Sequence, residues 1–352
     1  MVGRLVAENP DASILMTATT ETGLAQARKM FGDKIAYAYA PYDTPGSVGR
    51  FLKQIKPRIL VVMETEIWPN LITQCYRKQV PVFLINARLS ERSARGYERV
   101  RGLVRPVMQK ITWIAAQAEK DAERFRRIGV APASVEVTGS VKFDVDITEG
   151  IRESARQCRQ ILGARPVWVA GSTHAGEDEQ LLEAHRAVLG QHPQALLVIV
   201  PRHPDRFGSV AELAEKAGFN VARRSLQQDP AHAQVYLGDT MGELMMLYGA
   251  GDMAFVGGSL IERGGHNPLE PAAWGIPVLS GPHVFNFETV YERLRAGEGV
   301  VMVQSGDELG QAVVRLMATR EERQALGERA LAVVNKNRGA LDRVVEGIVE
   351  RL

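Results

Sequence analysis

The protein has 352 residues, of which 45% are hydrophobic and 24% charged, so the chain is too long for one ordinary core and too apolar to be disordered. Its two cysteines, Cys75 and Cys158, lie far apart and outside any Cys/His ligand spacing, which argues against a disulfide framework and a zinc site. The formal net charge of +2 conceals a basic first half, residues 1–150, beside a mildly acidic remainder, and we expect the basic half to meet an anionic surface or substrate.

Short β-branched runs alternate with longer segments of helical period, a pattern typical of parallel sheets covered by helices. The strands predicted in the first half are Ser13–Ala18, Ile35–Tyr39, Ile59–Met63, Val82–Ile85, Trp113–Ala116 and Val135–Thr138. Those predicted in the second half are Val167–Ala170, Leu196–Val200, Val235–Leu237, Met253–Val256, Pro277–Leu279 and Val300–Val303. The final stretch, 321–352, is predicted to form two helices separated near 337–339.

This rhythm predicts an α/β fold with two doubly wound Rossmann-like domains that face each other across a cleft. The segment 144–163 separates the two sets of strands. We expect an amino-terminal domain at 1–147, a carboxy-terminal domain at 148–320, and terminal helices at 321–352 that pack back on the first domain. Because open α/β sheets bind ligands at the carboxyl ends of their strands, the chemistry is expected in the loops that follow strands.

Two carboxylates, Glu64 and Glu66, follow the predicted strand 59–63, with Trp68 beside them. Carboxylates at a strand exit can bind hydroxyls or manage charge at a reacting centre, although a polar loop that caps the next helix would look the same. Lys142 follows the last predicted strand of the first half and is expected to point toward the cleft. It suits a salt bridge and a catalytic cation equally.

An arginine cluster follows the strand 82–85, and its members are Arg88, Arg92, Arg95, Arg99, Arg101 and Arg105. The spacing of the first four places them on one face of a helix. Most charge runs are solvated faces, and Glu91 and Glu98 partly offset this one. Binding of an anionic acceptor or a membrane surface is the functional alternative.

The second half begins with a turn, 171–174, in the position of a phosphate-binding loop. It has too few glycines for a Walker or dinucleotide fingerprint, which disfavours ATP, GTP and NAD. Ser172 and His174 could instead contact a donor substrate, or they could belong to a capped turn. After the next strand, Arg202 is placed to hold a phosphate in the cleft.

A helix start is predicted after the strand 235–237, where Thr240 and Glu243 match a capping box. A glycine early in a helix, such as Gly242, destabilises the helix by roughly 1 kcal/mol relative to Ala. Close approach of a ligand would explain why a glycine stands there. A bare cap is the structural alternative to a ligand site here.

The densest loop is GSLIERGGHNPLEP, residues 258–271, in which Asn267 suits an N-cap, Pro268 the first helical position and Glu270 the third. Such a helix start offers free N–H groups and a positive dipole end to a phosphate. Capping alone explains Asn267 and Glu270. It explains neither His266 nor the glycine pairs, which let a backbone approach a ligand.

Six motifs occur in order between about Asp11 and Phe287, namely METEIWPNLI, NARLSERSARGY, GSVKFD, VPRHPDRF, GDTMGELMMLYGAGD and FVGGSLIERGGHNPLEP. Through them the sequence closely resembles the 3-deoxy-D-manno-octulosonic acid (Kdo) transferases, which build the inner core of lipopolysaccharide. The resemblance implies the GT-B fold, CMP-Kdo as donor, a lipid A precursor (lipid IVA) as acceptor, and inversion at the anomeric carbon with no metal or other cofactor.

The resemblance also implies where the chain acts and through which residues. It would place CMP against Pro201, Arg202, Met241, Gly242, Glu243, Asn267, Pro268, Leu269 and Glu270. It would make Glu64 and Lys142 stabilisers of the transition state, with Glu66 the less favoured carboxylate. The expected location is the cytoplasmic face of the bacterial inner membrane, with an anionic membrane surface and no nucleic acid among the partners. No apolar run here reaches the roughly 18 to 20 residues that span a bilayer.

One departure concerns the amino terminus. Members of the family begin with a membrane anchor and a first strand ending in a serine, glycine, glutamate segment whose glutamate is the general base, and neither is present. Residues 2–9 resemble the end of the following helix. We therefore expect a truncated chain with an exposed sheet edge that binds CMP-Kdo but transfers slowly, because a general base contributes roughly 10² to 10⁴ in rate.

Two other functions share these features. A UDP-sugar epimerase of GT-B-like fold has a similar cleft and a Gly-rich nucleotide loop, but would bind a uridine diphosphate. A non-catalytic nucleotide-binding remnant would keep the donor loops without the reaction.

Overall fold

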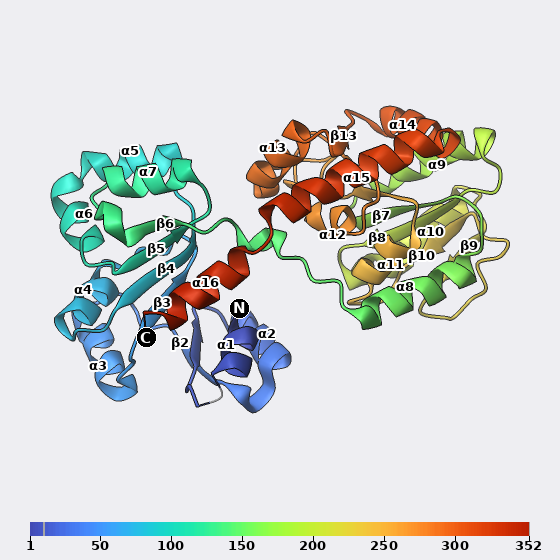
Figure 1. The fold of residues 1–352 in the computed structure, drawn as a ribbon. Helices are drawn as coiled ribbons and strands as arrows, with labels where there is room; N and C mark the ends of the chain where they lie inside the picture. Colours follow the sequence, from blue (N-terminus) through green and yellow to red (C-terminus); the bar gives the residue numbers. More distant parts are fainter. Residues whose placement is uncertain (10, 352) are drawn as a thin grey trace. The chain divides into compact units, whose positions relative to one another are not determined.

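The computed structural model describes residues 1–9 and 11–351, which form two compact units (Figure 1). Unit 1 comprises Met1–Asp144 with Asn337–Leu352, and unit 2 comprises Val145–Lys336. The chain thus divides at residue 144, close to the predicted 147. The two terminal helices are split between the units, because α15 (Arg320–Asn337) lies almost entirely in unit 2 and α16 (Ala340–Val349) in unit 1.

Unit 2 is built on one seven-stranded parallel sheet in the order β13-β12-β11-β7-β8-β10-β9. Its strands are β7 (Val167–Thr173), β8 (Leu196–Pro201), β9 (Val221–Arg223), β10 (Val235–Leu237), β11 (Met253–Val256), β12 (Val278–Ser280) and β13 (Val300–Met302). Its helices besides α15 are α8 (Glu149–Leu162), α9 (Asp178–Gln191), α10 (Phe207–Lys216), α11 (Leu244–Ala250), α12 (Leu269–Ala273), α13 (Glu288–Ala296) and α14 (Gly306–Ala318).

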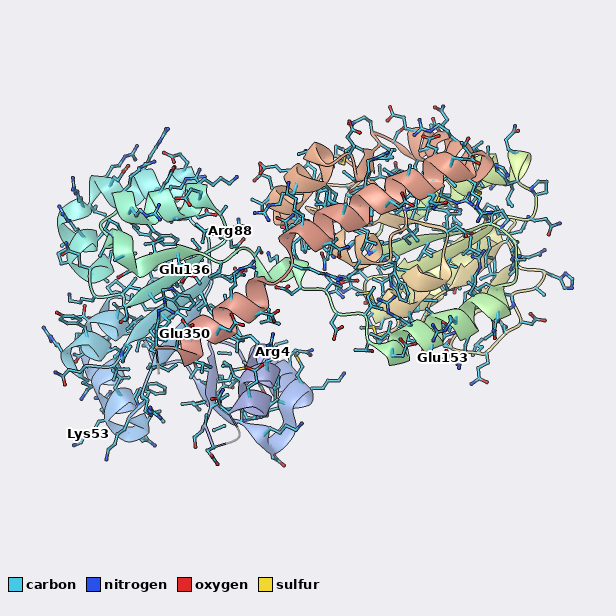
Figure 2. All side chains as sticks on the ribbon, viewed as in Figure 1. Arg4, Lys53, Arg88, Glu136, Glu153 and Glu350 are labelled. Carbon is cyan, nitrogen blue, oxygen red and sulfur yellow. The ribbon has the colours of Figure 1, made fainter. Side chains whose placement is uncertain are left out.

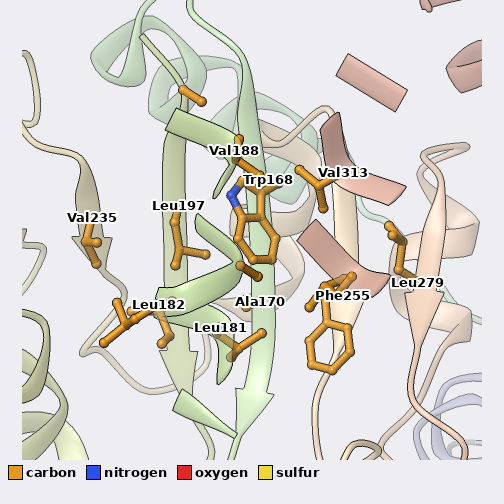
Figure 3. Close-up of a cluster of buried hydrophobic side chains, with 14 of the residues drawn as sticks. Trp168, Ala170, Leu181, Leu182, Val188, Leu197, Val235, Phe255, Leu279 and Val313 are labelled. Atoms are coloured by element: carbon orange, nitrogen blue, oxygen red, sulfur yellow. The ribbon is translucent and has the colours of Figure 1, made fainter. Parts of the chain in front are cut away.

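The central strand β7 is buried along its whole length, because helices cover both faces of the sheet. Trp168 and Ala170 pack into a core shared with α9, α10 and α14 (Figure 3). Val167 and Val169 point to the opposite face and pack with α8 and α11. Because side chains alternate between the two faces of a strand, both faces of β7 lie in apolar surroundings, and this fixes the register of the strand.

Unit 1 contains two separate parallel sheets, one of order β1-β2 and one of order β3-β4-β5-β6. The strands are β1 (Leu15–Ala18), β2 (Ala36–Tyr39), β3 (Leu60–Met63), β4 (Val82–Ala87), β5 (Trp113–Ala116) and β6 (Val135–Val137). The helices besides α16 are α1 (Val2–Glu8), α2 (Glu21–Phe31), α3 (Pro45–Ile55), α4 (Pro69–Arg77), α5 (Glu91–Arg99), α6 (Arg101–Met108) and α7 (Glu119–Arg127). Short 3₁₀ turns, such as η3 (Val141–Phe143), join several of these elements.

The last helix, α16, covers one face of the four-stranded sheet. Its Val344 and Ile348 pack against Phe83 of β4 and Trp113 of β5, with Leu5 of α1 at the border of the same cluster. Because this face is closed by helices from both ends of the chain, unit 1 depends on a segment that follows unit 2 in sequence. The other face packs on α3, α4 and α7.

Every predicted strand is present, with ends that differ from the prediction by at most three residues. The strand β9 was not predicted, because three residues at a sheet edge carry too little apolar pattern. Charged side chains such as Lys53 and Glu153 project outward from their helices (Figure 2). Among the described residues, each helix is too short or too polar to span a bilayer.

Candidate functional site

The predicted donor residues lie in unit 2, in the loops that follow β8, β10 and β11. The order β11-β7-β8-β10 makes these strands near neighbours, with β7 in the middle, and all of them are parallel. Their carboxyl ends therefore meet along one edge of the sheet, which is where open α/β sheets bind ligands. The sequence prediction that strand exits carry the chemistry is compatible with this placement.

Arg202 follows β8 directly and is exposed, whereas Pro201 is the buried last residue of the strand. The backbone N–H of Arg202 donates a hydrogen bond of 3.0 Å to the carbonyl oxygen of Thr173, the last residue of β7. Arg206 reinforces the same junction, because it donates to the Thr173 carbonyl at 2.9 Å and to the buried carboxylate of Asp178. These bonds fix the backbone at Arg202, whose side chain is exposed to solvent.

The loop after β10 differs from the predicted helix start. α11 begins at Leu244 rather than at Thr240, and Gly242 has a positive φ of 84° that ends any helix before it. The carboxylate of Glu243 does not cap the backbone, because Arg224 holds it with bonds of 2.5 and 2.7 Å and the Thr240 hydroxyl donates to it as well. The Arg224 bonds lower the pKa of Glu243. The capping-box interpretation was therefore wrong.

The same loop nevertheless leaves room for a ligand. A Cβ atom at Gly242 would meet no atom within 4 Å, so this glycine is required by its backbone angle and not by packing. The side chain of Met241 beside it is 62% exposed. An exposed apolar side chain at a strand exit, next to open space, is suited to contact with a planar base.

The loop after β11 leads into α12, which begins at Leu269, one residue later than predicted. Asn267 still serves the helix start, because its side-chain oxygen accepts the backbone N–H of Leu269 at 3.1 Å while its amide nitrogen lies 3.4 Å from a Glu270 oxygen. Pro268, at the N-cap, is buried. The helix spans only five residues, so its dipole is weaker than the sequence interpretation assumed. Burial raises the pKa of Glu270, and Asn267 and Arg202 oppose that shift.

The glycine pair of this loop is required by packing and by its backbone angles. A Cβ atom at Gly264 would lie 2.5 Å from the side chains of Phe285 and Asn286, and both Gly264 and Gly265 have positive φ. The pair is therefore needed to press the loop against the segment 283–286. Packing thus accounts for the glycine pair, and the expectation that it also lets a ligand approach stays a prediction.

An imidazole pair joins the β7 and β11 loops. His174 follows β7, and its Nε2 lies 2.8 Å from Nε2 of His266 in the β11 loop. His203, just after Arg202, packs edge-on against His174 with ring centroids 5.4 Å apart. Burial, followed by neighbouring cationic groups, lowers the pKa of both His174 and His266 to about 4.

Glu177 holds this arrangement in place, although sequence reasoning did not identify it. Its buried carboxylate accepts the backbone N–H of His174 at 3.1 Å, and three N–H groups of the β11 loop at 2.7 to 3.0 Å. Those three belong to Gly258, Ser259 and Leu260. A carboxylate three residues after His174 was the available signal, but the partners in the β11 loop are 81 to 83 residues away.

Unit 1 brings together Glu64 and Lys142. Glu64 leaves β3 with a positive φ of 60°, an uncommon angle for a residue other than glycine. Its carboxylate lies 3.9 Å from the Lys142 ammonium, so the two predicted residues form an ion pair. Glu66 does not join them, because it accepts the indole N–H of Trp68 at 3.2 Å.

The loop that carries Lys142 is fastened at both ends. Asn86, at the end of β4, also has a positive φ, of 50°, and its side-chain oxygen accepts the N–H of Val141 at 3.2 Å. On the other side Asp144 accepts the N–H groups of Gly339 and Leu341 at 2.6 and 2.7 Å, and so caps α16. Neither Asn86 nor Asp144 was singled out from the sequence.

The arginine cluster does not form one helical face. Arg88 lies before α5, and α5 ends at Arg99 before α6 begins at Arg101. Within α5, Glu91 pairs with Arg95 and also with Arg127 of α7, so part of the charge is neutralised internally. Val100, between the helices, and Leu103, in α6, are 48% and 78% exposed beside Arg101 and Arg105.

Among the described residues, no group of three or more His, Cys, Asp or Glu side chains is arranged to hold a metal ion. The His174–His266 pair has Arg202, Arg206 and Arg263 as its charged neighbours, which would repel a cation.

Comparison with known proteins identifies the family. Residues 1–145 match the family model described as 3-deoxy-D-manno-octulosonic-acid transferase (kdotransferase). A 3-deoxy-D-manno-octulosonic acid transferase of Haemophilus influenzae is 42% identical over 98% of this chain and 82% of its own length. A solved structure of the C-terminal CMP-Kdo binding domain of WaaA from Acinetobacter baumannii is 36% identical over 53% of this chain and 99% of that domain, with a TM-score of 0.51.

A third relative agrees in fold alone. The UDP-GlcNAc 2-epimerase of Neisseria meningitidis is 16% identical, covering 96% of this chain and 91% of its own, with a TM-score of 0.61. Together with the two α/β units, these likenesses confirm the predicted GT-B-type fold. The match to the Haemophilus protein covers 98% of this chain and so includes both units. The chain therefore belongs to the Kdo transferase family of glycosyltransferases.

Proposed function

We propose that the protein transfers Kdo from CMP-Kdo to a lipid A precursor, lipid IVA, with inversion at the anomeric carbon and without a metal ion. The observation that carries this proposal is the row of donor loops on unit 2, whose counterpart in Acinetobacter baumannii is described as a CMP-Kdo binding domain. The row presents a cation at Arg202, an exposed side chain at Met241 and the start of α12.

Each loop would contact a different part of CMP. The guanidinium of Arg202 can bind a phosphate through two parallel N–H groups. Met241 and Gly242 offer an open apolar surface, suited to the base or ribose, and Glu243 supports that surface through Arg224. Asn267, Pro268, Leu269 and Glu270 would form the remaining wall, where the partly buried Glu270 can accept a hydrogen bond from a ligand amine or hydroxyl.

Glu64 and Lys142 would stabilise the transition state. CMP leaves with additional negative charge, and an ammonium placed near that charge lowers the barrier without a metal. The ion pair at 3.9 Å fixes the lysine, and the positive φ of Glu64 turns its carboxylate out of the strand direction. Both residues stand on secured backbone, which suits a preorganised charge.

The exposed segment around Leu103 would lie against the membrane that holds the acceptor. The apolar side chains of Val100 and Leu103 can enter the membrane interface. Arg101 and Arg105 would then meet anionic headgroups, and each arginine contributes about 1 kcal/mol to binding near such a surface. Sedimentation with vesicles containing phosphatidylglycerol should fall after Leu103→Glu and should not change after Lys53→Glu, an exposed control in α3. Equal binding by both variants would refute this orientation.

Calorimetric titration with CMP and with UDP tests the donor assignment. The unmodified chain should bind CMP more tightly than UDP, and Arg202→Ala should lower CMP affinity by roughly 10- to 100-fold because a charge-assisted contact is lost. Arg315→Ala serves as the matched control, because it removes an exposed arginine of α14 that forms an ion pair with Glu322 of α15. Preference for UDP would support the epimerase alternative. CMP binding without any transfer from CMP-Kdo to lipid IVA would support the non-catalytic alternative.

A further inference from the structure

The imidazole pair of His174 and His266 occupies the middle of the donor row but has no part in the proposed CMP contacts. His174 follows β7, and β7 lies between β11, which leads to Asn267, and β8, which leads to Arg202. A ligand that reaches from the β11 loop to the β8 exit must pass over the end of β7. The pair is therefore placed against the centre of such a ligand.

The geometry of the pair dictates its hydrogen bonds. The two Nε2 atoms are 2.8 Å apart, so one must carry a proton that the other accepts. In the neutral pair the accepting ring then carries its own proton on Nδ1, while Nδ1 of the donating ring is bare. No described residue bonds to either Nδ1 atom, so one donor and one acceptor remain available.

One added proton changes this site completely. It binds at the bare Nδ1 and leaves the Nε2 contact intact, so the pair gains a unit positive charge and presents two Nδ1–H donors. The rings lie in one plane and meet at Nε2 with centroids 5.0 Å apart, so their Nδ1–H groups point away from each other. A carboxylate can accept one of these N–H groups, and its charge offsets the added one. The pair can therefore bind an anion when it takes up one proton.

We propose that the His174–His266 pair binds the carboxylate of the donor's ulosonic acid sugar and takes up one proton from solvent as it does so. This inference rests on the proposed function. In CMP-Kdo the carboxylate carbon and the phosphate oxygen are bonded to the same anomeric carbon, so the carboxylate must lie close to the phosphate. Arg202, the proposed phosphate ligand, is close enough to affect the charge state of both rings.

The surroundings explain why the free pair is neutral. Partial burial and the charges of Arg202, Arg206 and Arg263, together with the neighbouring His203, disfavour a cation at the pair and lower its pKa to about 4. Glu177 does not neutralise it, because the carboxylate faces the backbone N–H groups of both loops. A bound carboxylate supplies the missing counter-charge, which must raise the pKa of the pair in the complex.

Glu177 makes the site rigid. Its four N–H bonds tie the turn after β7 to the loop after β11, so the two rings come from loops that cannot separate independently. Gly258 allows the close approach, because a Cβ atom there would lie 3.0 Å from the His266 ring. The pair is therefore preorganised before any ligand arrives.

Titration of CMP and CMP-Kdo against His174→Phe and His266→Phe tests the inference. Phenylalanine keeps a ring and removes both nitrogens. We expect each variant to bind CMP as the unmodified chain does, which also shows that unit 2 is folded, but to lose on the order of tenfold in CMP-Kdo affinity. His232→Phe, at an exposed histidine of the same unit, should change neither affinity.

Proton uptake gives a second test that needs no variant. CMP-Kdo binding to the unmodified chain, measured in buffers of different ionisation enthalpy, should take up protons and should strengthen as pH falls from about 8 to about 6. Unchanged CMP-Kdo affinity in both Phe variants, an equal loss of CMP and CMP-Kdo affinity, or the absence of proton uptake would each overturn the proposal. If the unmodified chain binds neither ligand, the proposed function itself fails.

Discussion

Unit 2 carries one unbroken seven-stranded sheet, whereas the strands of unit 1 form a two-stranded and a four-stranded sheet. In unit 2 the central strand β7 is paired on both sides and buried on both faces, so the loops at its carboxyl end start from a fixed frame. In the described part of unit 1, β1 and β3 each pair on one side only. Its candidate residues depend instead on individual side-chain hydrogen bonds to the backbone, such as those accepted by Asn86 and Asp144.

The two units also differ in their titrating groups. All seven histidines of the chain lie between residues 174 and 283, inside unit 2, and three of them have a pKa lowered to about 4. Unit 1 instead holds the basic arginine cluster and the Glu64–Lys142 pair. Under the proposed function, unit 2 would bind the donor and unit 1 would supply charge to the reaction.

The largest effect that would test this division is expected at Lys142. Replacing Lys142 by Met should lower the rate of CMP release from CMP-Kdo with lipid IVA by roughly 10² to 10³, because a preorganised charge at the transition state is lost. CMP affinity should not change, since the donor loops belong to unit 2. Steady-state kinetics and calorimetry measure the two quantities, with Lys53→Met, an exposed lysine of α3, as control. If Lys142→Met lowered CMP affinity and left the rate unchanged, unit 1 would contribute to donor binding and the proposed division between the units would be wrong.

The fold was largely predictable from the sequence because its strands are apolar runs bounded by turn residues. β5, β10 and β11 have exactly the bounds that the pattern predicted. The interruption between β1 and β3 could not be predicted, because strand pairing depends on contacts between segments and not on the strands' own composition. The helix α16 packs back on the first domain, as predicted, but its partners Phe83 and Trp113 could not be named, because they are distant in sequence and no local pattern connects them to it.

The candidate site was predicted less completely. Helix-capping rules drew attention to Glu243 and Asn267, but Glu243 bonds to Arg224, a residue that no local pattern connects to it. The same limit applies to Glu177, whose partners come from the β11 loop. Positive φ angles at Glu64 and Asn86 are a property of the folded backbone, and these residue types do not reveal them. Sequence reasoning thus located the loops but not the bonds that hold them.

The second expected effect concerns acid stability and should appear in unit 2 alone. His185 is fully buried, and it accepts the indole N–H of Trp168 at 3.1 Å on Nδ1 while Nε2 faces the Gln234 carbonyl at 2.8 Å. These partners fit the neutral ring, and burial lowers its pKa to about 4. The stabilisation is complete above the unfolded pKa of about 6.5 and is lost as pH falls from 6.5 toward 4, by about 3 kcal/mol at most.

Urea unfolding followed by fluorescence at several pH values measures this slope. His185→Gln should flatten it, because the amide can accept from Trp168 and donate to Gln234 without titrating. His232→Gln, at an exposed histidine, should leave the slope unchanged. If unit 1, which contains no histidine, lost stability over the same pH range, the contrast between the units would have another cause.

The smallest expected effect is at the cap of α16. Asp144→Asn keeps the shape of the side chain but weakens its bonds to the N–H groups of Gly339 and Leu341, at a cost of about 1 kcal/mol. Because α16 closes one face of the four-stranded sheet, amide exchange in β4 and β5 should rise while exchange in β7 and β8 stays constant. Asp342→Asn, an exposed residue of the same helix that pairs with Arg4, is the matched control. Equal changes in both sheets would mean that α16 stabilises the whole chain and that unit 1 does not depend on it in particular.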